Sequence, residues 1–377
     1  MAVPTLHSAA IPAQTVQSHA SNLLQLPDKT LLCAWFGGSQ EGLPDICIWL
    51  SRLEPGSSDW SVPRKISAVE NRSCQNPVLF RNPKSGDLLL FHTSQELGDQ
   101  DSCVVISKKS TDGGVTWSEP TYPLKGVKGA FVRQPVVVLE DGTWVLPVFH
   151  CRPTPGFRWI GNDDIAAVFY SKDEGQTWTE SVVPDSFGAV HMNIIAPPKP
   201  GADYVAFYRS RWADSVYRAT SPDGLNWTAP KPTVLPNPNS GIAAARLPSG
   251  NIALVFNRSS AAADSAKREG LYDDITSEED KRKNQPAIHG KSAIWGTPRK
   301  TLTVGISTDE GLTWKERVLE EGDGFCMTNN SIEKTNRELS YPSILVEGKV
   351  AHIAFTFHRQ YIKYVRVEDV EAWVNAA

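Results

Sequence analysis

The 377-residue sequence lacks several features that would assign it to a class of protein at once. Its formal net charge is only −4, so we expect no basic surface for nucleic acid or for an anionic membrane. No apolar run reaches membrane-spanning length, and the first residues lack the basic start and apolar segment of a signal peptide. We therefore expect a cytoplasmic protein with no nucleic-acid or membrane partner, or a secreted one if a leader has been trimmed away.

Cysteine is scarce, and its six positions show none of the spacings typical of metal ligands. Reduced, mostly buried thiols are the expectation rather than disulfides. Histidine, aspartate and glutamate likewise form no cluster with ligand spacing, so we expect no metal ion and no other cofactor.

Tryptophan, glycine and proline are plentiful, at 12, 27 and 27 residues, which favours a turn-rich, all-β protein. One phrase recurs as STDGGVTW at 110–117, SKDEGQTW at 171–178 and STDEGLTW at 307–314, with a shortened form, SPDGLNW, at 221–227. Its aspartate can accept hydrogen bonds from nearby backbone N–H groups, and its glycine tolerates a positive φ. The pattern predicts a tight hairpin turn whose tryptophan is buried between neighbouring sheets.

Longer segments of the chain repeat as well, each as a strand, a tight turn and a second strand. There are six of them, at 19–38, 75–94, 133–152, 191–210, 239–258 and 340–359. Each is followed by further strand-like sequence, so four short strands recur along the chain, as in the blades of a β-propeller. We predict a single domain over 1–377, an all-β six-bladed propeller with four-stranded antiparallel blades. The first stretch, VPTLHSAAIPA, is expected to join the last blade and close the ring.

These turns resemble Asp-box (BNR) repeats, and the whole chain resembles the sialidase (neuraminidase) superfamily of six-bladed propellers. The resemblance implies a hydrolase, a glycosidase of carbohydrate metabolism, on a divergent sialidase-like branch. The same fold also hosts lyases and non-catalytic binders, so the reaction has to be argued from the site.

The lengths of the connections predict which face of the propeller binds ligand. The turns between first and second strands are short and lie on the same face as the Asp boxes. The remaining connections open on the other face, and several are long, including an inserted loop at about 259–297. Long loops on a rigid scaffold are where binding residues concentrate. Residues Leu271, Tyr272, Ile288, Ile294 and Trp295 give this loop apolar ends, and we expect a partly ordered flap over the rim of a pocket.

Polar side chains recur at the strand ends that point to this loop-rich face. First strands begin with His19, Asn76, Arg133, His191, Asn193, Asn239 and Tyr341, and second strands end with His92, His150, Arg209, Arg211, Asn257, His358 and Arg359. Any one of them could be a hydrogen-bonded structural residue. Because so many converge, we predict one polar axial pocket lined by substrate-binding residues.

The resemblance also implies roles for particular residues. Asp45 stands where the family has its acid/base, with Glu41 as a second candidate, and Tyr341 stands where the family has its nucleophilic tyrosine. Glu338 is close in sequence, although the family's glutamate partner usually comes from another blade.

The family's three carboxylate-binding arginines are only partly matched. His19-Ala20-Ser21 replaces an Arg-Ile-Pro motif, and Trp35 to Gly38 replaces another arginine. We expect Arg133, Arg209 and Arg359 to rebuild the clamp, because a guanidinium offers paired donors to a carboxylate. Arg246 falls on the opposite face.

Three functions remain open at this point. The first is an exo-acting sialidase-like glycosidase that removes a terminal acidic sugar. The second is a uronate-specific lyase in which His92, His150 or His191 abstracts a proton, and the third is a non-catalytic glycan or protein binder. In the first two the partner is a carbohydrate that carries a carboxylate.

Overall fold

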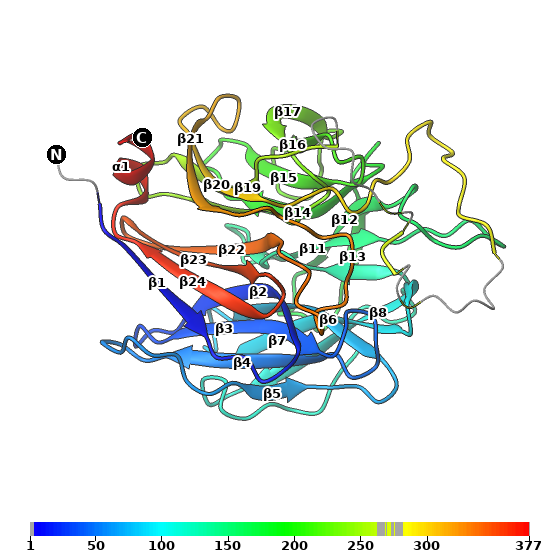
Figure 1. Cartoon of the computed structure of the whole chain (residues 1–377). Helices are drawn as coiled ribbons and strands as arrows, with labels where there is room; N and C mark the ends of the chain where they lie inside the picture. Colours follow the sequence, from blue (N-terminus) through cyan, green and yellow to red (C-terminus); the bar gives the residue numbers. More distant parts are fainter. Residues whose placement is uncertain (1–3, 262–267, 269, 273–274, 276–281, 377) are drawn as a thin grey trace.

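A computed structural model describes residues 4–261, 268, 270–272, 275 and 282–376. Six antiparallel sheets are arranged around one axis, with the first strand of each blade innermost (Figure 1). The predicted all-β six-bladed propeller is therefore confirmed. None of the helical segments in these ranges is long and apolar enough to cross a membrane.

Most blades have the expected four strands. Blade 1 contains β2 (Gln17–Gln25), β3 (Leu31–Gly38), β4 (Cys47–Leu53) and β5 (Arg64–Ser67). Blade 4 contains β14 (Ala189–Ile195), β15 (Tyr204–Ser210), β16 (Ser215–Ser221) and β17 (Lys231–Pro236). Blade 5 contains β18 (Ala243–Arg246), β19 (Ile252–Asn257), β20 (Thr301–Ser307) and β21 (Lys315–Glu321).

Two blades depart from this number. Blade 2 has three strands, β6 (Ser73–Arg81), β7 (Leu88–Glu96) and β8 (Asp99–Ser110), and its outer edge is reduced to a bridge between Ser107 and Thr121. Blade 3 has five, because its inner strand is split into β9 (Ala130–Val132) and β10 (Val137–Val138), both paired with β11 (Trp144–His150). Its outer strands are β12 (Ile165–Ser171) and β13 (Thr179–Val182).

Blade 6 closes the ring with the start of the chain. Its inner strands are β22 (Leu339–Glu347), β23 (Val350–Phe357) and β24 (Tyr361–Val367), and the N-terminal strand β1 (Leu6–Ile11) is added outside β24. The pairing is antiparallel, from Leu6 opposite Val367 to Ile11 opposite Ile362, so the predicted closure is confirmed. A short helix, α1 (Val370–Asn375), follows β24.

Each Asp box begins on the last residue of a blade's third strand and turns the chain into the outer edge. In blade 3, Ser171 Oγ lies 2.7 Å from Asp173 Oδ1, and Asp173 accepts a hydrogen bond of 2.8 Å from the backbone N–H of Thr177. Bonds from Thr177 and Ser171 lower the pKa of Asp173 to about 2. The same serine–aspartate contact, at 2.8–3.0 Å, recurs in the other three boxes.

Tryptophans pack at the interfaces between blades, as predicted, although burial is complete only for Trp227. The other three Asp-box tryptophans, Trp117, Trp178 and Trp314, are half-buried. The two interfaces without an Asp box use Trp60 and Trp373, each buried in the cluster between its blade and the preceding one. Every interface thus contains one such ring.

A bulge breaks the inner strand at the same place in several blades, and a residue with positive φ accompanies it. These residues are Ala20, Asn76, His191 and Tyr341, and Asn239, which precedes β18 in blade 5, has the same backbone conformation, with φ between 50° and 59° in all five. Most non-glycine residues avoid this left-handed region, and bulges re-aim side chains near functional sites. The bulge therefore sets where the inner strands direct their first side chains.

The two faces of the propeller differ as predicted. On one, which we call the turn face, lie the short first turns, the Asp boxes and helix α1. On the other, the loop face, lies the inserted loop, whose described part at 282–297 (yellow) is on the side away from α1 in Figure 1.

Candidate active site

Tyr341 is at the centre of a buried polar group on the axis, at the inner start of blade 6. Its ring centroid is 4.3 Å from that of His19 in blade 1 and 5.5 Å from that of His191 in blade 4. Only 8% of Tyr341 is exposed. The guanidinium carbons of Arg133, Arg209 and Arg299 lie 5.7, 5.4 and 5.6 Å from the ring centroid. We call this set the axial cluster; it also includes Glu41, Asn239, Glu338 and Arg359.

Two arginines of the axial cluster hold Tyr341 directly. Arg209 donates Nη1–H to the tyrosine hydroxyl and Nε–H to Asn239 Oδ1 at 2.6 Å. Arg133 donates from Nη2 to the carbonyls of Tyr341 and Pro342, at 3.1 and 2.9 Å. Neither guanidinium has a carboxylate partner among the described residues.

The other two arginines share the carboxylate of Glu338, which is fully buried. Arg299 Nη1 lies 2.5 Å from Glu338 Oε2, and Arg359 donates Nε–H to Glu338 Oε1. Arg359 also reaches Glu41 Oε2, at 2.6 Å. Burial alone would raise the pKa of Glu338, but Arg359 and Arg299 hold it well below the usual range, so the carboxylate is charged.

Positive charge is in excess at this centre. Four buried guanidiniums face two carboxylates, and one nitrogen each of Arg133 (Nε), Arg209 (Nη2) and Arg299 (Nε) has no hydrogen-bond partner. Burial lowers the pKa of Arg133 to about 10 and of Arg209 to about 9, so both stay charged at neutral pH. Buried charges without partners are costly, which makes the centre suited to an anionic ligand.

The two histidines beside Tyr341 are uncharged. Burial, and then Arg359, lower the pKa of His19 well below its ordinary value; burial and then Arg209 do the same for His191. His19 Nδ1 pairs with Thr356 Oγ1 at 2.9 Å, whereas His19 Nε2 and His191 Nδ1 have no partner. Each ring therefore has one buried nitrogen without a hydrogen bond in this cluster.

Arg211 lies near the axial cluster but is compensated. Asp164 pairs with its Nη2 at 2.7 Å, and its guanidinium carbon lies 4.9–5.5 Å from the rings of Phe149, Trp159 and Trp295. Trp295, from the end of the inserted loop, also lies 5.7 Å from Arg209 and is 1% exposed. The loop thus supplies a wall of this centre.

The other described end of the insert docks across the axis on blade 2. The Tyr272 hydroxyl accepts hydrogen bonds of 3.0–3.2 Å from the side-chain amides of Gln75, Gln95 and Gln100. Leu271, Tyr272 and Trp295 are buried, as expected for docked ends, whereas Ile294 is half-buried and Ile288 is exposed. The polar middle of the predicted flap lies largely outside the described residues.

Asp45, the expected acid/base, lies in an exposed part of the blade-1 connection. Its carboxylate accepts hydrogen bonds of 2.7 and 2.8 Å from the backbone and hydroxyl of Ser39. This is the geometry of a loop-capping aspartate, and no hydrogen bond joins it to the described part of the axial cluster. Glu41 does join the cluster, through Arg359.

Several other predicted pocket residues do not lie around Tyr341. His92 is fully buried between blades 1 and 2, with Ser67 Oγ at 2.8 Å and the carbonyl of Thr93 at 3.0 Å, and burial lowers its pKa to about 4. His150 pairs with Glu180 on the outer strand of blade 3 at 2.5 Å. His358 is half-buried and stacks on Phe357. These three histidines therefore lie apart from the side chains that surround Tyr341.

Asparagines at the predicted positions mostly tie blades together. Asn193 accepts a hydrogen bond of 2.7 Å from the Ala244 N–H in the next blade. Asn257 donates to the Leu339 carbonyl, also at 2.7 Å. Asn76 is buried at its bulge, and Asn239 alone among them contacts an arginine of the axial cluster.

Arg299, Asp164 and Trp295 were not among the predicted site residues. Arg299 lies two residues before the third strand of blade 5 and Asp164 one residue before that of blade 3, close to the position that Asp45 has in blade 1, two residues before β4. The same rule applied to every blade would have found the first two. Trp295 was expected only as an apolar end of the insert. Within the described ranges, no group of three or more histidine, cysteine, aspartate or glutamate side chains is placed to hold a metal ion.

Comparison with known proteins gives a family and a fold. Residues 29–353 match the family described as BNR repeat-like domain. A search of curated protein sequences finds no match.

Among solved structures, a leech intramolecular trans-sialidase with 2,7-anhydro-Neu5Ac aligns with a TM-score of 0.69 and 11% identity, covering 100% of this chain and 71% of that one. A protein of unknown function from Dyadobacter fermentans gives 0.68 and 17%, covering 97% and 100%. A Hadza microbial sialidase gives 0.67 and 16%, covering 94% of this chain and 66% of the sialidase. At these identities the likeness establishes a sialidase-like fold.

Proposed function

The chain belongs to the BNR repeat-like domain family, and from that premise we propose that it is an exo-acting glycosidase that removes a terminal acidic sugar from a glycan. The observation that carries the proposal is the excess of buried guanidinium groups around Tyr341. Arg133 and Arg209 have no carboxylate of their own and keep nitrogens without partners. A sugar carboxylate supplies the missing charge and acceptors.

Substrate binding in this proposal begins with that carboxylate. It lies near Arg133, Arg209 and Arg299, which supply the positive charge that the two carboxylates of the cluster leave in excess. Charge-assisted hydrogen bonds to buried guanidiniums are among the strongest polar contacts in proteins. Glu338 and Asn239 hold Arg299 and Arg209 in place, so the donors are oriented before the sugar arrives.

Tyr341 is the nucleophile of the proposed reaction. Arg209 donates a hydrogen bond to its hydroxyl, which stabilises a phenolate. The neutral ring of His191 takes the phenol proton, in the place of the glutamate of the resembled enzymes. The phenolate oxygen then bonds to the anomeric carbon as the glycosidic bond breaks, and water releases the sugar in a second step.

The departing oxygen has to be protonated, and the blade-1 connection carries the candidates. Asp45 donates this proton after its carboxylate leaves Ser39, and returns as a base to activate the water. Glu41 is bound to Arg359 and keeps that arginine against Glu338.

A second function is favoured by the two neutral histidines. Elimination from a uronate needs a base for the proton on the carbon beside the carboxylate, and His19 or His191 can accept it. The arginines would neutralise the carboxylate, Tyr341 would protonate the departing oxygen, and a carbon–carbon double bond would form. Asp45 has no part in this reaction, which agrees with its exposed position.

One experiment separates these functions. A panel of oligosaccharides ending in sialic, glucuronic or galacturonic acid is incubated with the protein in heavy-oxygen water, and the products are weighed by mass spectrometry. Hydrolysis adds one labelled water across the broken bond, and elimination adds none and creates an ultraviolet-absorbing double bond. Binding without turnover of any member, with Arg209→Lys weakening that binding, would reduce the protein to a lectin-like binder and overturn both enzymes.

A further inference from the structure

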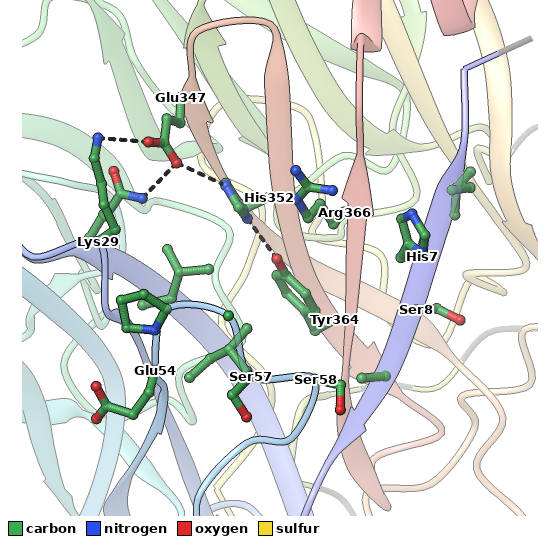
Figure 2. Close-up of a pocket in the computed structure, with 17 residues that line it drawn as sticks. His7, Ser8, Lys29, Glu54, Ser57, Ser58, Glu347, His352, Tyr364 and Arg366 are labelled. Carbon is green, nitrogen blue, oxygen red and sulfur yellow. Dashed lines mark hydrogen bonds and ion pairs between the residues drawn. The ribbon is translucent and has the colours of Figure 1, made fainter.

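A second cavity lies on the turn face, at the seam where blade 6 meets blade 1. Its volume is about 700 Å³, within the range of ~300–1,000 Å³ typical of ligand pockets. Strands β1 and β24 form one wall, and the turns after β2 and β4 form the other (Figure 2). We call it the seam cavity; it is on the opposite face from the connections that carry the axial cluster.

The cavity exists because blade 1 has no Asp box. In blade 2, Ser110 and Trp117 enclose the tight box, whereas Ser51 and Trp60 in blade 1 enclose a turn two residues longer. Trp60 still packs against Tyr364 across the seam, with the ring centroids 5.2 Å apart. The turn of residues 53–58 stands outside this contact and contributes six lining residues.

Charges in the seam cavity are already paired. Lys29 Nζ lies 2.6 Å from Glu347 Oε1, and Gln25 donates to Glu347 Oε2 at 2.8 Å. Arg366 pairs with Glu368, and Glu54 accepts from Thr30 at 2.9 Å. The lining of the seam cavity therefore carries no excess of positive or negative charge, in contrast to the axial cluster. It does not favour an anion or a cation.

Hydrogen-bonding capacity remains nevertheless. The hydroxyls of Ser8 and Ser58 have no hydrogen-bond partner in the described residues, and the Glu54 carboxylate is 60% exposed. Figure 2 places Ser8 and Arg366 across the cavity from Lys29 and Glu54. Between these polar groups the lining is apolar, from Leu6, Ala9, Leu31, Leu53 and Pro55.

We propose that the seam cavity binds a neutral saccharide of two or three units, away from the axial cluster. A sugar presents hydroxyls that both donate and accept, together with apolar C–H faces, and the lining matches both. A phosphate or carboxylate ligand would need unpaired cations, and a lipid chain would need a lining without carboxylates. A sugar bound here contacts blades 6 and 1 at once.

The test uses saturation-transfer NMR with neutral gluco-, galacto-, manno- and xylotrioses. At least one should bind the wild-type protein with a dissociation constant in the millimolar range or below. Ser58→Trp, on the exposed turn, should fill the cavity and weaken that binding at least tenfold. Ser249→Trp makes the same change on the turn face of blade 5 and should leave binding unchanged.

Two further measurements keep this proposal separate from the proposed function. Tyr341→Phe should retain the neutral-sugar signal, and Ser58→Trp should retain activity on acidic oligosaccharides. The proposal is overturned if no trisaccharide binds, if Ser58→Trp binds as well as wild type, or if Tyr341→Phe abolishes the signal. Tighter binding of inorganic phosphate than of any trisaccharide, lost in Ser58→Trp, would also overturn it.

Discussion

The turn face and the loop face of this propeller are built from the same strands and follow opposite rules. On the turn face, four Asp boxes repeat one set of hydrogen bonds with little variation. On the loop face, equivalent strand starts carry Ala20, Asn76, His191, Asn239 and Tyr341, a different residue in most blades. The repeated bonds maintain the blades, and the variation between blades creates the site.

Charge separates the faces as well. Aspartates of the boxes are at the surface, where backbone and hydroxyl donors satisfy them. Arginines of the axial cluster are buried, and some of their nitrogens lack partners. Substitutions on the turn face should therefore change stability, and substitutions in the axial cluster should change activity.

Tyr341→Phe should produce the largest effect and tests whether the axial cluster carries the reaction. We expect kcat/KM on the best acidic oligosaccharide to fall at least about a hundredfold. The hydroxyl is the nucleophile in the proposed hydrolysis and protonates the departing oxygen in the proposed elimination. Tyr204→Phe, at the start of β15 on the turn face, should leave the rate unchanged. Equal rates for wild type and Tyr341→Phe would remove the tyrosine from the chemistry.

Arg209→Lys should rank second. A lysine has all its donors on one atom and cannot reproduce the planar fork that reaches Tyr341 and Asn239 from different nitrogens, so kcat/KM should fall about 10–100-fold, or ~1.4–2.7 kcal/mol. When the carboxyl group of the substrate is reduced to an alcohol, wild type and Arg209→Lys should have similar kcat/KM. Arg246→Lys is the matched control, because Arg246 pairs with Glu310 on the turn face at 2.7 Å. A similar loss in both variants would contradict the division between faces.

Trp178→Ala tests the turn face through stability. Its ring is edge-to-face with Phe91 of the neighbouring blade, with centroids 6.1 Å apart. Because the tryptophan is only half-buried, we expect a loss of about 2–3 kcal/mol, below the ~3–5 kcal/mol of fully buried rings. Denaturant unfolding measures this loss, and activity per folded molecule should stay constant. A large fall in kcat for the folded variant would show that the turn face also affects the reaction, against this prediction.

His92→Gln should give the smallest effect and concerns pH. The folded pKa of His92 is about 4, whereas an unfolded histidine titrates near 6.5. Between these values only the unfolded chain binds the proton, so stability falls as pH drops through this window, by ~1.4 kcal/mol per unit. From pH 7 to 5, wild type should lose ~2 kcal/mol more than the variant. Urea unfolding at both pH values checks this, and equal losses would refute it.

The repeated turns made the fold predictable from sequence, because each Asp box fixes where a third strand ends. Ring closure by β1 followed from an unpartnered strand at the start of the chain. The tryptophans Trp60 and Trp373 were not anticipated as packing elements, because no box precedes them. Their role depends on which blade they meet, a long-range relation that local pattern does not contain.

The candidate site was predictable in part, for a related reason. Tyr341, Arg133, Arg209 and His191 were found because equivalent positions of the repeat converge near the axis. His150 was misplaced, since its side chain points to the outer strand and Glu180. Alternation along a strand sends neighbouring side chains to opposite faces, and a single-residue error in register reverses the expectation.

Strand β1 has a consequence for how the protein is made. Its partner β24 follows it in sequence only after the other five blades, so a ribosome has to synthesise those blades before β1 can pair. Until then, β1 is an exposed edge tethered to five growing blades, and such edges recruit foreign strands. A stalled or truncated translation product would be an open ring, and clearance of such products would depend on chaperones and proteases recognising that edge.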